Sequence, residues 1–249
     1  MKILGLIPSR LGSTRLKEKP LLKIGGIPIV IHTYRRAKLS KTLNDLYICC
    51  DDIKIKNICD QYDAKCILTS KKHKNGTERI AEAYKKLGKK FNFIIDIQGD
   101  EPLLQPKHID QVVNFHQKNL SADIILPTLK SFKKSGKNVV KVLVSEAKNV
   151  LYLSRENLPF EFKKKNNFFL KHLSIISFKP AALIKFYKSK ETFLERAEGI
   201  ELLRAIEIDL KIKTLTLKGD SFSVDIKKDL YKAKKYILKD KLFKKYSIK

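Results

Sequence analysis

The residues best suited to chemistry lie in the first loop of the chain, where hydroxyls and cations follow an apolar run. Residues 2–7 lead into Pro8-Ser9-Arg10-Leu11-Gly12-Ser13-Thr14-Arg15, and Lys19-Pro20 follows shortly after. Backbone N–H groups, hydroxyls and fixed cations that converge after a buried strand are suited to binding a polyanion. Only eight of the 53 Lys and Arg are arginines, and two of those lie in this loop. Arginine offers a planar donor fork that lysine lacks, so we expect a nucleoside triphosphate here rather than a merely cationic loop.

The same loop excludes the two commonest nucleotide-binding motifs. It has no Gly-Lys-Ser/Thr, as a P-loop requires, and its one glycine, Gly12, cannot make a G-x-G-x-x-G fingerprint. A triphosphate held mainly by side-chain cations suits a reaction in which pyrophosphate is the leaving group.

Two aspartates distant in the sequence are candidate metal ligands. Asp100 follows Gly99 just after a predicted strand, and Asp225 lies at the end of another. Mg²⁺ prefers one or two carboxylates together with phosphate oxygens and water, so the pair predicts a magnesium site beside the cationic loop. The alternative for Asp225 alone is a helix cap.

A third candidate segment is Asn75-Gly76-Thr77-Glu78-Arg79, which is typical of a turn that begins a helix. We expect Thr77 to cap this helix, and its amides and Arg79 to face the same cleft. The alternative is a plain capped helix with no role in binding.

Apolar runs and amphipathic segments alternate up to about residue 126, which predicts βαβ units and a mostly parallel sheet. Because ligands collect at the carboxyl ends of parallel strands, the loops after residues 7, 68 and 97 should meet. The expected strands are 2–7, 45–50, 65–68, 93–97 and 123–126, and the expected helices are 28–39, 52–62, 77–87 and 107–119.

The alternation breaks after residue 126, which predicts an inserted β-rich subdomain at about 130–190 within a single domain, 1–249. We expect strands at 139–144, 150–154 and 171–178, helices near 180–188 and 194–206, a strand at 211–217 and a helix to about 238. The basic tail from Lys239 is predicted to be a frayed surface element.

Composition limits the classes of partner. The net charge is +27 and the pI is about 9.9, but the lysines are spread from Lys2 to Lys249, without an RNA-binding aromatic motif. We therefore expect a solvated surface and no specific nucleic acid.

Four cysteines between residues 49 and 66 lack disulfide or zinc spacing. No apolar stretch reaches membrane-spanning length, so we expect a soluble, cytoplasmic protein without membrane insertion.

Several motifs along the chain carry a family resemblance. They are the loop from Ile7 to Leu21, G-T-E-R at 76–79, Q-G-D-E-P at 98–102, L-Y-L-S-R at 151–155, Lys171-His172 and Val224-Asp225. In this order they resemble the 3-deoxy-manno-octulosonate cytidylyltransferases (CMP-Kdo synthetases) over nearly the whole chain. The resemblance implies an α/β, Rossmann-like nucleotidyltransferase fold with a mostly parallel sheet and an inserted β-rich dimerisation subdomain.

The resemblance also implies an activity: transfer of CMP from CTP to the anomeric hydroxyl of 3-deoxy-manno-octulosonate (Kdo), with Mg²⁺ as cofactor, for lipopolysaccharide biosynthesis. The implied partners are CTP, the sugar acid and a second copy of the chain in a homodimer. The implied catalytic residues are Arg10, Lys19, Asp100 and Asp225, the last two as metal ligands. The implied CTP site is Pro8, Ser9, Arg10, Gly12, Ser13, Arg15, Lys19, Gly76, Gln98 and Asp100, and the implied sugar site is Arg79, Arg155, His172 and Glu201.

The chain departs from the family pattern on the sugar side. Residues 172–179 read H-L-S-I-I-S-F-K where the family usually reads H-I-G-I-Y-A-Y-R, and Leu202 replaces a glutamine. A related acceptor, such as an 8-amino Kdo analogue or a nonulosonic acid, is therefore the second hypothesis. A basic polyanion-binding protein without activity is the third.

Overall fold

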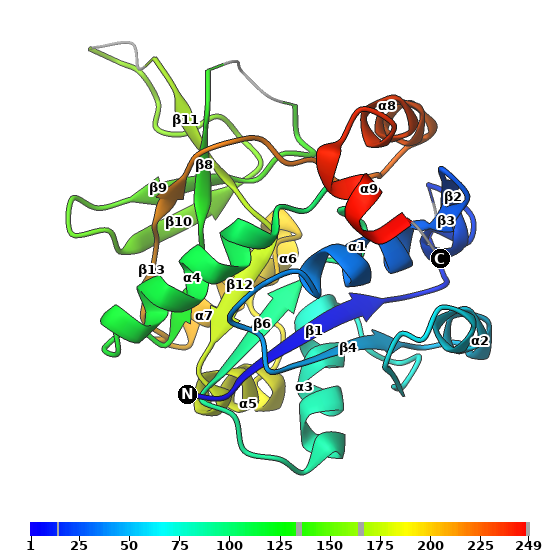
Figure 1. Ribbon diagram of the computed structural model, residues 1–249. Helices are drawn as coiled ribbons and strands as arrows, with labels where there is room; N and C mark the ends of the chain where they lie inside the picture. The colour runs from blue at the N-terminus through cyan, green and yellow to red at the C-terminus, as the bar shows by residue number, and fades with distance from the viewer. Residues whose placement is uncertain (14, 133–135, 164–166, 248–249) are drawn as a thin grey trace. The chain divides into compact units, whose positions relative to one another are not determined.

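The apolar runs of the first 110 residues form neighbouring parallel strands (Figure 1). In the computed structural model, which describes residues 1–13, 15–132, 136–163 and 167–247, β1 (Ile3–Ser9) pairs with β4 (Asp45–Cys50) and β6 (Phe93–Ile97). β5 (Cys66–Leu68) lies beyond β4, which gives the order β6-β1-β4-β5. Every residue of β1 and β6 is buried, as is typical of strands covered on both faces.

The connecting helices begin close to the positions that the sequence predicts. They are α1 (Ile29–Ala37), α2 (Ile53–Gln61), α3 (Gly76–Leu87) and α4 (Pro106–Lys118). The expectation that Thr77 caps α3 is wrong. Asn75 is the N-cap, because its Oδ1 accepts from the backbone N–H of Glu78 at 2.9 Å, and Thr77 lies inside the first turn.

The chain divides into two compact units, Met1–Asp110 with Ser221–Lys249, and Gln111–Asp220. The second unit extends beyond the expected insertion at 130–190 on both sides. In it, β12 (Ile175–Phe178) and β13 (Ile212–Lys213) pair with β7 (Ile124–Ile125), β12 antiparallel and β13 parallel. A five-stranded sheet has the order β10 (Val150–Ser154), β9 (Lys141–Val144), β11 (Phe169–His172), β8 (Thr128–Ser131) and β14 (Thr216–Leu217).

Two expected strands of the second unit are each interrupted. The run 171–178 divides into β11 and β12, and the run 211–217 into β13 and β14, because each run leaves one sheet and continues in the other. The helices here are α5 (Pro180–Lys188), α6 (Phe193–Glu198) and α7 (Leu202–Glu207). A buried ion pair joins α7 to α6: Arg204 Nε and Nη2 each lie 2.6 Å from a carboxylate oxygen of Glu195.

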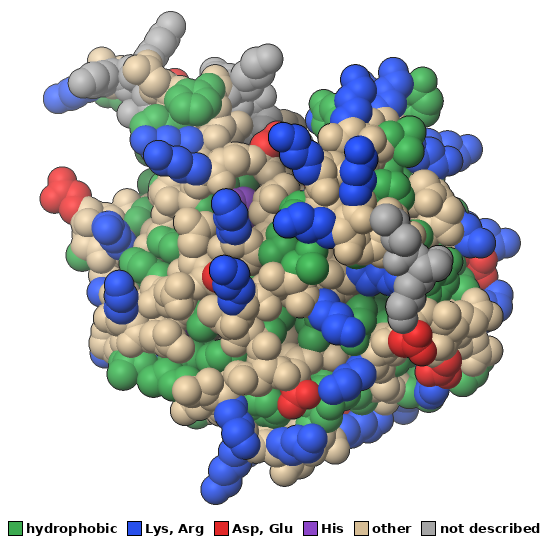
Figure 2. All heavy atoms as spheres, viewed as in Figure 1, with side chains coloured by type: hydrophobic (Ala, Val, Ile, Leu, Met, Phe, Trp, Pro, Cys, Tyr) green, Lys and Arg blue, Asp and Glu red, His purple; other side chains and the backbone are tan. Residues whose placement is uncertain are grey.

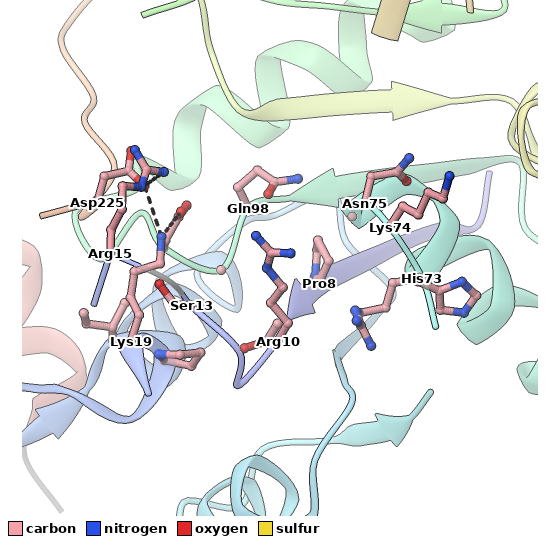
Figure 3. A pocket seen from close by; sticks show the side chains of 17 residues that line it. Pro8, Arg10, Ser13, Arg15, Lys19, His73, Lys74, Asn75, Gln98 and Asp225 are labelled. Carbon is pink, nitrogen blue, oxygen red and sulfur yellow. Dashed lines mark hydrogen bonds and ion pairs between the residues drawn. The ribbon is translucent and has the colours of Figure 1, made fainter. Parts of the chain in front are cut away.

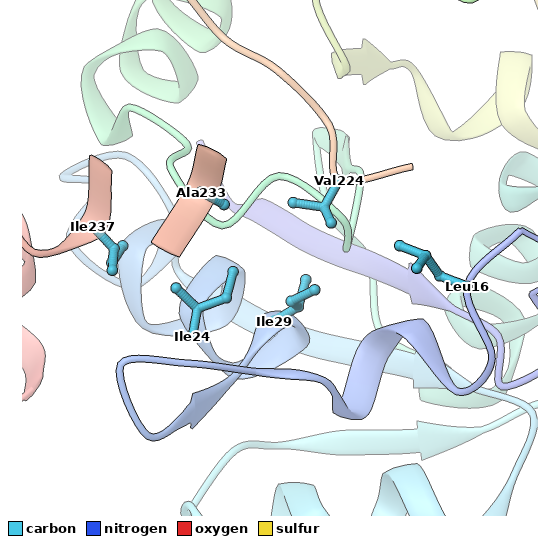
Figure 4. Close-up of a cluster of buried hydrophobic side chains, with 6 residues drawn as sticks. All are labelled: Leu16, Ile24, Ile29, Val224, Ala233 and Ile237. Carbon is cyan, nitrogen blue, oxygen red and sulfur yellow. The ribbon is translucent and has the colours of Figure 1, made fainter. Parts of the chain in front are cut away.

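The C-terminal segment returns to the first unit as α8 (Lys227–Ile237) and α9 (Lys241–Ser247). Buried residues of this segment pack with the first loop and the β2–β3 hairpin (Lys23–Ile24 and Ile27–Pro28) (Figure 4). The members of this cluster are Leu16, Ile24, Ile29, Val224, Ala233 and Ile237.

The prediction of a frayed tail is wrong, because α9 is anchored on α1. The Tyr246 hydroxyl donates to His32 Nδ1 at 2.9 Å, Arg35 donates to the Tyr246 carbonyl at 2.9 Å, and Arg36 pairs with Asp240. The sequence did not reveal these contacts, because the lysines around Tyr246 are typical of a solvated segment.

Lysine and arginine side chains are spread over the viewed face and do not form one patch (Figure 2). Within the described part of the chain, no helix is both long and apolar enough to cross a membrane. None of the four cysteines forms a disulfide.

Candidate functional site

The three predicted loops line one pocket of the first unit, at the carboxyl ends of β1, β5 and β6 (Figure 3). The segment after β1 supplies the cations, the segment before α3 supplies polar groups, and the segment after β6 supplies an amide and a carboxylate. η1 (Lys19–Leu21) and Asp225 complete the wall. The lining residues are Pro8, Ser9, Arg10, Ser13, Arg15, Lys19, Pro20, Ile29, His73, Lys74, Asn75, Gly76, Arg79, Gln98, Gly99, Asp100 and Asp225.

Two polar groups where β1 meets the first loop have no partner among the described residues. Arg10 lies exposed at the pocket and has no ion pair among the described residues. The buried Ser9 hydroxyl has no hydrogen-bond partner in the same part of the chain. The loop itself is held by Asp51, whose Oδ1 accepts from the Leu11 N–H at 2.9 Å. Gly12 is not among the lining residues, and Thr14 lies outside the described residues.

The two candidate metal ligands converge on one ammonium group. Lys19 Nζ lies 2.7 Å from Asp100 Oδ2 and 3.3 Å from Asp225 Oδ1, and Arg15 Nη2 lies 2.9 Å from the same Asp225 oxygen. A backbone hydrogen bond of 2.9 Å from the Val224 N–H to the Asp100 carbonyl joins the two segments. Asp100 and Asp225, which are 125 positions apart in the sequence, therefore lie side by side in the pocket.

Asp225 is kept ionised by its neighbours. Burial alone would raise the pKa of its carboxyl group. The charge of Lys19, the hydrogen bond from the Ser223 hydroxyl at 2.9 Å and the charge of Arg15 together outweigh burial, so the pKa lies below its usual value. The alternative of a helix cap does not describe it, because the residue that precedes α8 is Ile226. The carboxylate is therefore available as an anionic ligand at neutral pH.

Gln98 presents a defined atom to the pocket. Its Nε2 donates to both oxygens of the buried Asp96 at 3.1 and 3.0 Å. Because a carboxylate only accepts, the amide nitrogen must face Asp96, and Oε1 is left as an acceptor.

Two glycines make room for this arrangement. A Cβ at Gly99 would lie 2.8 Å from the Pro8 carbonyl oxygen, and one at Gly76 would lie 3.2 Å from Gln98 Nε2. Gly99 therefore leaves no room for a side chain beside the Pro8 carbonyl, and a side chain at Gly76 would require Gln98 or Pro8 to shift by a few tenths of an ångström.

Arg79 lines the pocket, but its guanidinium also supports the wall. It is buried and donates to Thr69 Oγ1 at 2.8 Å, to the Ser70 carbonyl at 3.1 Å and to Asp51 Oδ2 at 3.3 Å. Since Asp51 also holds the first loop, Arg79 links three segments of the site. Its expected contact with a sugar stays a prediction.

The other residues expected on the sugar side lie in the second unit. Arg155 donates to the carbonyls of Lys137, Glu198 and Gly199 at 2.8–3.0 Å. His172 has a buried Nε2 without a partner among the described residues, and burial lowers the pKa of its imidazole to about 4. Glu201 is the N-cap residue of α7. Their roles toward a sugar remain predictions.

Sequence reasoning did not single out His73 and Lys74, which line the pocket, or Asp51 and Asp96, which support it. His73 contacts Glu82 of α3 through Nε2. The signal for His73 and Lys74 was their place in the loop after a parallel strand. In the sequence, Asp51 and Asp96 could not be told apart from ordinary polar residues. Asp51 acts through the distant Leu11 and Arg79, and Asp96 acts through the orientation of Gln98, which the sequence does not show.

A parallel α/β sheet with a cationic loop and an acid pair at its carboxyl edge places the protein in the class of nucleotide-binding α/β proteins. The chain belongs to the cytidylyltransferase family, whose model matches residues 4–212. Two curated relatives and one solved structure show which members of this family the chain resembles.

A 3-deoxy-manno-octulosonate cytidylyltransferase from Thermodesulfovibrio yellowstonii is 37% identical over 246 residues, which is 92% of this chain and 96% of that protein. An 8-amino-3,8-dideoxy-manno-octulosonate cytidylyltransferase from Shewanella pealeana is 34% identical over 236 residues, which is 92% of this chain and 96% of that protein. The structure of CMP:2-keto-3-deoxy-manno-octonic acid synthetase complexed with CTP superposes with a TM-score of 0.89 at 27% identity, over 96% of this chain and 99% of that chain.

Proposed function

We propose that this protein transfers the CMP group of CTP to the anomeric hydroxyl of Kdo and releases pyrophosphate. The observation that carries the proposal is the convergence of Asp100, Asp225 and Lys19 in a pocket lined by Arg10, in a chain 37% identical to a Kdo cytidylyltransferase. In this reaction the hydroxyl oxygen bonds to the α-phosphorus, the bond from the α-phosphorus to the pyrophosphate oxygen breaks, and the hydroxyl proton passes to solvent water.

The residues present fit a Mg²⁺ ion. Asp100 Oδ2 and Asp225 Oδ1 both contact one cation, Lys19, and so can face a common ion. The described residues contain no cluster of three or more His, Cys, Asp or Glu suited to a metal, so the other ligands would come from phosphate oxygens and water, as Mg²⁺ prefers. When bound, the ion supplies Lewis-acid stabilisation of charge on the phosphates and lowers the pKa of a bound hydroxyl.

The protein's own residues bind and orient the nucleotide. Arg10 offers a bidentate donor to a phosphate, the Ser9 hydroxyl is an unused hydrogen-bonding group beside it, and Gln98 Oε1 offers an acceptor to the nucleoside. Arg15 and Lys19 are placed to offset the charge that develops on the leaving pyrophosphate. Such catalysis works by positioning and electrostatics and needs no covalent intermediate.

The test is an acceptor panel. Purified protein, CTP and Mg²⁺ are incubated with Kdo, 8-amino-3,8-dideoxy-Kdo and a nonulosonic acid, and pyrophosphate release is measured with and without EDTA. We expect the highest kcat/KM with Kdo and loss of turnover with EDTA. Low turnover with Kdo and high turnover with another acid would refute the acceptor, and activity that survives EDTA would refute the metal.

The 8-amino acid is the second candidate because two observations favour it. The Shewanella relative is nearly as similar as the Kdo enzyme, at 34% against 37% identity. Leu202, the first residue of α7, also stands where the family pattern given above has a glutamine. A higher kcat/KM for the amino sugar would decide for this alternative.

We also propose that the protein is a homodimer in the cytoplasm. Phe160 and Phe162 of the second unit are 83% and 84% exposed, which favours an apolar contact between copies. The free thiols favour a reducing compartment. Sedimentation of the purified chain as a monomer at micromolar concentration would refute the dimer.

A further inference from the structure

The acid pair of the pocket is already neutralised by the protein's own cations. Asp100 contacts Lys19, and Asp225 contacts both Lys19 and Arg15, at 2.7–3.3 Å (Figure 3). Two carboxylates thus face two cationic side chains, and the ammonium lies where a metal shared by both acids would compete with it.

We infer that Lys19 is an exchangeable internal counter-ion, which keeps divalent metal weakly bound to the nucleotide-free enzyme and couples metal entry to CTP. The inference rests on the proposed function, because it assigns the same two acids as metal ligands.

The first step is the repulsion that an entering metal meets. Only 15% of the Lys19 side chain is exposed, so solvent screens its charge incompletely. A divalent ion bound to Asp100 and Asp225 would either face this ammonium at contact distance or displace it from both carboxylates. Either route weakens metal binding relative to an acid pair without the lysine.

The second step is the freedom of the lysine to leave. Its backbone is fixed, because η1 begins at Lys19, the Lys19 N–H donates to the Leu16 carbonyl at 3.2 Å, and Pro20 is buried. The four-carbon side chain can nevertheless rotate about its own bonds and carry the ammonium to another anion. Exchange is therefore a side-chain rotation that leaves the loop in place.

The third step is the effect of the triphosphate. Its negative charges provide Lys19 and Arg15 with new partners in the same pocket, so both acids are released to a metal that the phosphates also bind. CTP and metal should then bind with positive coupling, and linkage requires the effect to be reciprocal.

The experiment measures Mn²⁺ binding, by electron paramagnetic resonance and calorimetry, to the wild type and Lys19→Met, with and without CTP and with no acceptor present. Lys17→Met is the matched control, because Lys17 is exposed in the same loop and does not line the pocket. The double variant K19M/D100N reports whether any gained metal lies at the acid pair. Circular dichroism confirms folding, and Lys19→Gln serves as a second variant if Lys19→Met does not fold.

We expect nucleotide-free K19M to bind Mn²⁺ at least about tenfold more tightly than the wild type, and K17M to bind like the wild type. K19M/D100N should lose the gain. CTP should tighten Mn²⁺ binding more in the wild type than in K19M. Equal Mn²⁺ affinity of nucleotide-free wild type and K19M, or a gain that survives in the double variant, would overturn the inference.

Failure of the inference is distinguishable from failure of the proposed function. Unchanged Mn²⁺ affinity in K19M, with CMP-Kdo still formed by the wild type, removes only the counter-ion role. A wild type that forms no CMP-sugar with any acid refutes the function, whatever the metal titrations give.

Discussion

His32 should make the anchored C-terminal helix sensitive to acid. The imidazole is fully buried, with Nε2 2.7 Å from the Ile24 carbonyl and Nδ1 2.9 Å from the Tyr246 hydroxyl. A carbonyl can only accept, so Nε2 carries the proton and Nδ1 accepts from the tyrosine. A second proton on Nδ1 would remove that acceptor beside the positive charges of Arg35 and Arg36.

The magnitude follows from the pKa of this group. Burial, opposed by the bond to Ile24 and assisted by the two arginines, lowers the pKa of His32 from 6.5 to about 4. Between these pH values the unfolded chain binds a proton that the folded protein does not, so the free energy of unfolding falls as pH falls. The two pKa values differ by about 2.5, and each unit corresponds to about 1.4 kcal/mol, so His32 alone accounts for a loss of about 3.5 kcal/mol once the pH lies well below 4.

The assay is urea unfolding of the wild type and His32→Gln at pH 7, 6 and 5, because glutamine retains a neutral donor and acceptor. We expect the loss of stability from pH 7 to pH 5 to be about 2 kcal/mol smaller in the variant. Hydrogen exchange should show early opening of α9 in the wild type at pH 5. Equal pH dependence in both proteins would refute the reasoning.

The remaining predictions concern the site and the core. Asp100→Asn should lower pyrophosphate release by on the order of 10² or more with unchanged urea unfolding, and wild-type turnover would remove Asp100 from the metal site. Gly99→Ala, whose Cβ would lie 2.8 Å from the Pro8 carbonyl, should cost about 1–3 kcal/mol of stability and weaken CTP binding by calorimetry. Among the described residues no atom lies within 4 Å of a Cβ at Gly136, so Gly136→Ala serves as its control; equal behaviour of the two variants would contradict the steric argument. Arg204→Leu leaves a buried carboxylate without its partner and should cost about 3–5 kcal/mol in urea unfolding, whereas a loss below about 1 kcal/mol would show that the ion pair is dispensable.

The sequence predicted the elements of the first unit because hydrophobic periodicity is a local signal. β4 and β6 begin and end at the predicted residues, and α3 begins within one residue of its predicted start. The same signal failed where a chain leaves one sheet for another. The run 171–178 is continuously strand-like, and its division into β11 and β12 depends on their different partners, β8 and β7. The tail was misread because α9, with one buried and three half-buried residues among its lysines, looks like a solvated lysine-rich segment when its contacts with α1 are not known.

The site was predictable to the extent that it lies in loops after parallel strands. Arg10, Gln98 and Asp100 line the pocket because they follow β1 and β6, whose carboxyl ends lie at one edge of the sheet. Lys19 in η1 and Asp225 line it too, but the expectation that Asp225 lies at a strand end is wrong, because it lies between β14 and α8. Their pairing was not predictable. The sequence assigned Lys19 to the triphosphate, and only the three-dimensional arrangement places its ammonium between two carboxylates.

The bond from Lys19 to Asp225 spans 206 positions, and the second unit lies between them in the chain. Residues 1–110 therefore hold most of the nucleotide pocket but only one of its two acids. Because contacts between such distant residues form late and slowly in folding, we expect the pocket to acquire its last ligand only after the intervening 110 residues have brought the chain back to the first unit. An incomplete or misfolded chain would then lack Asp225 in the pocket, and with it the complete acid pair.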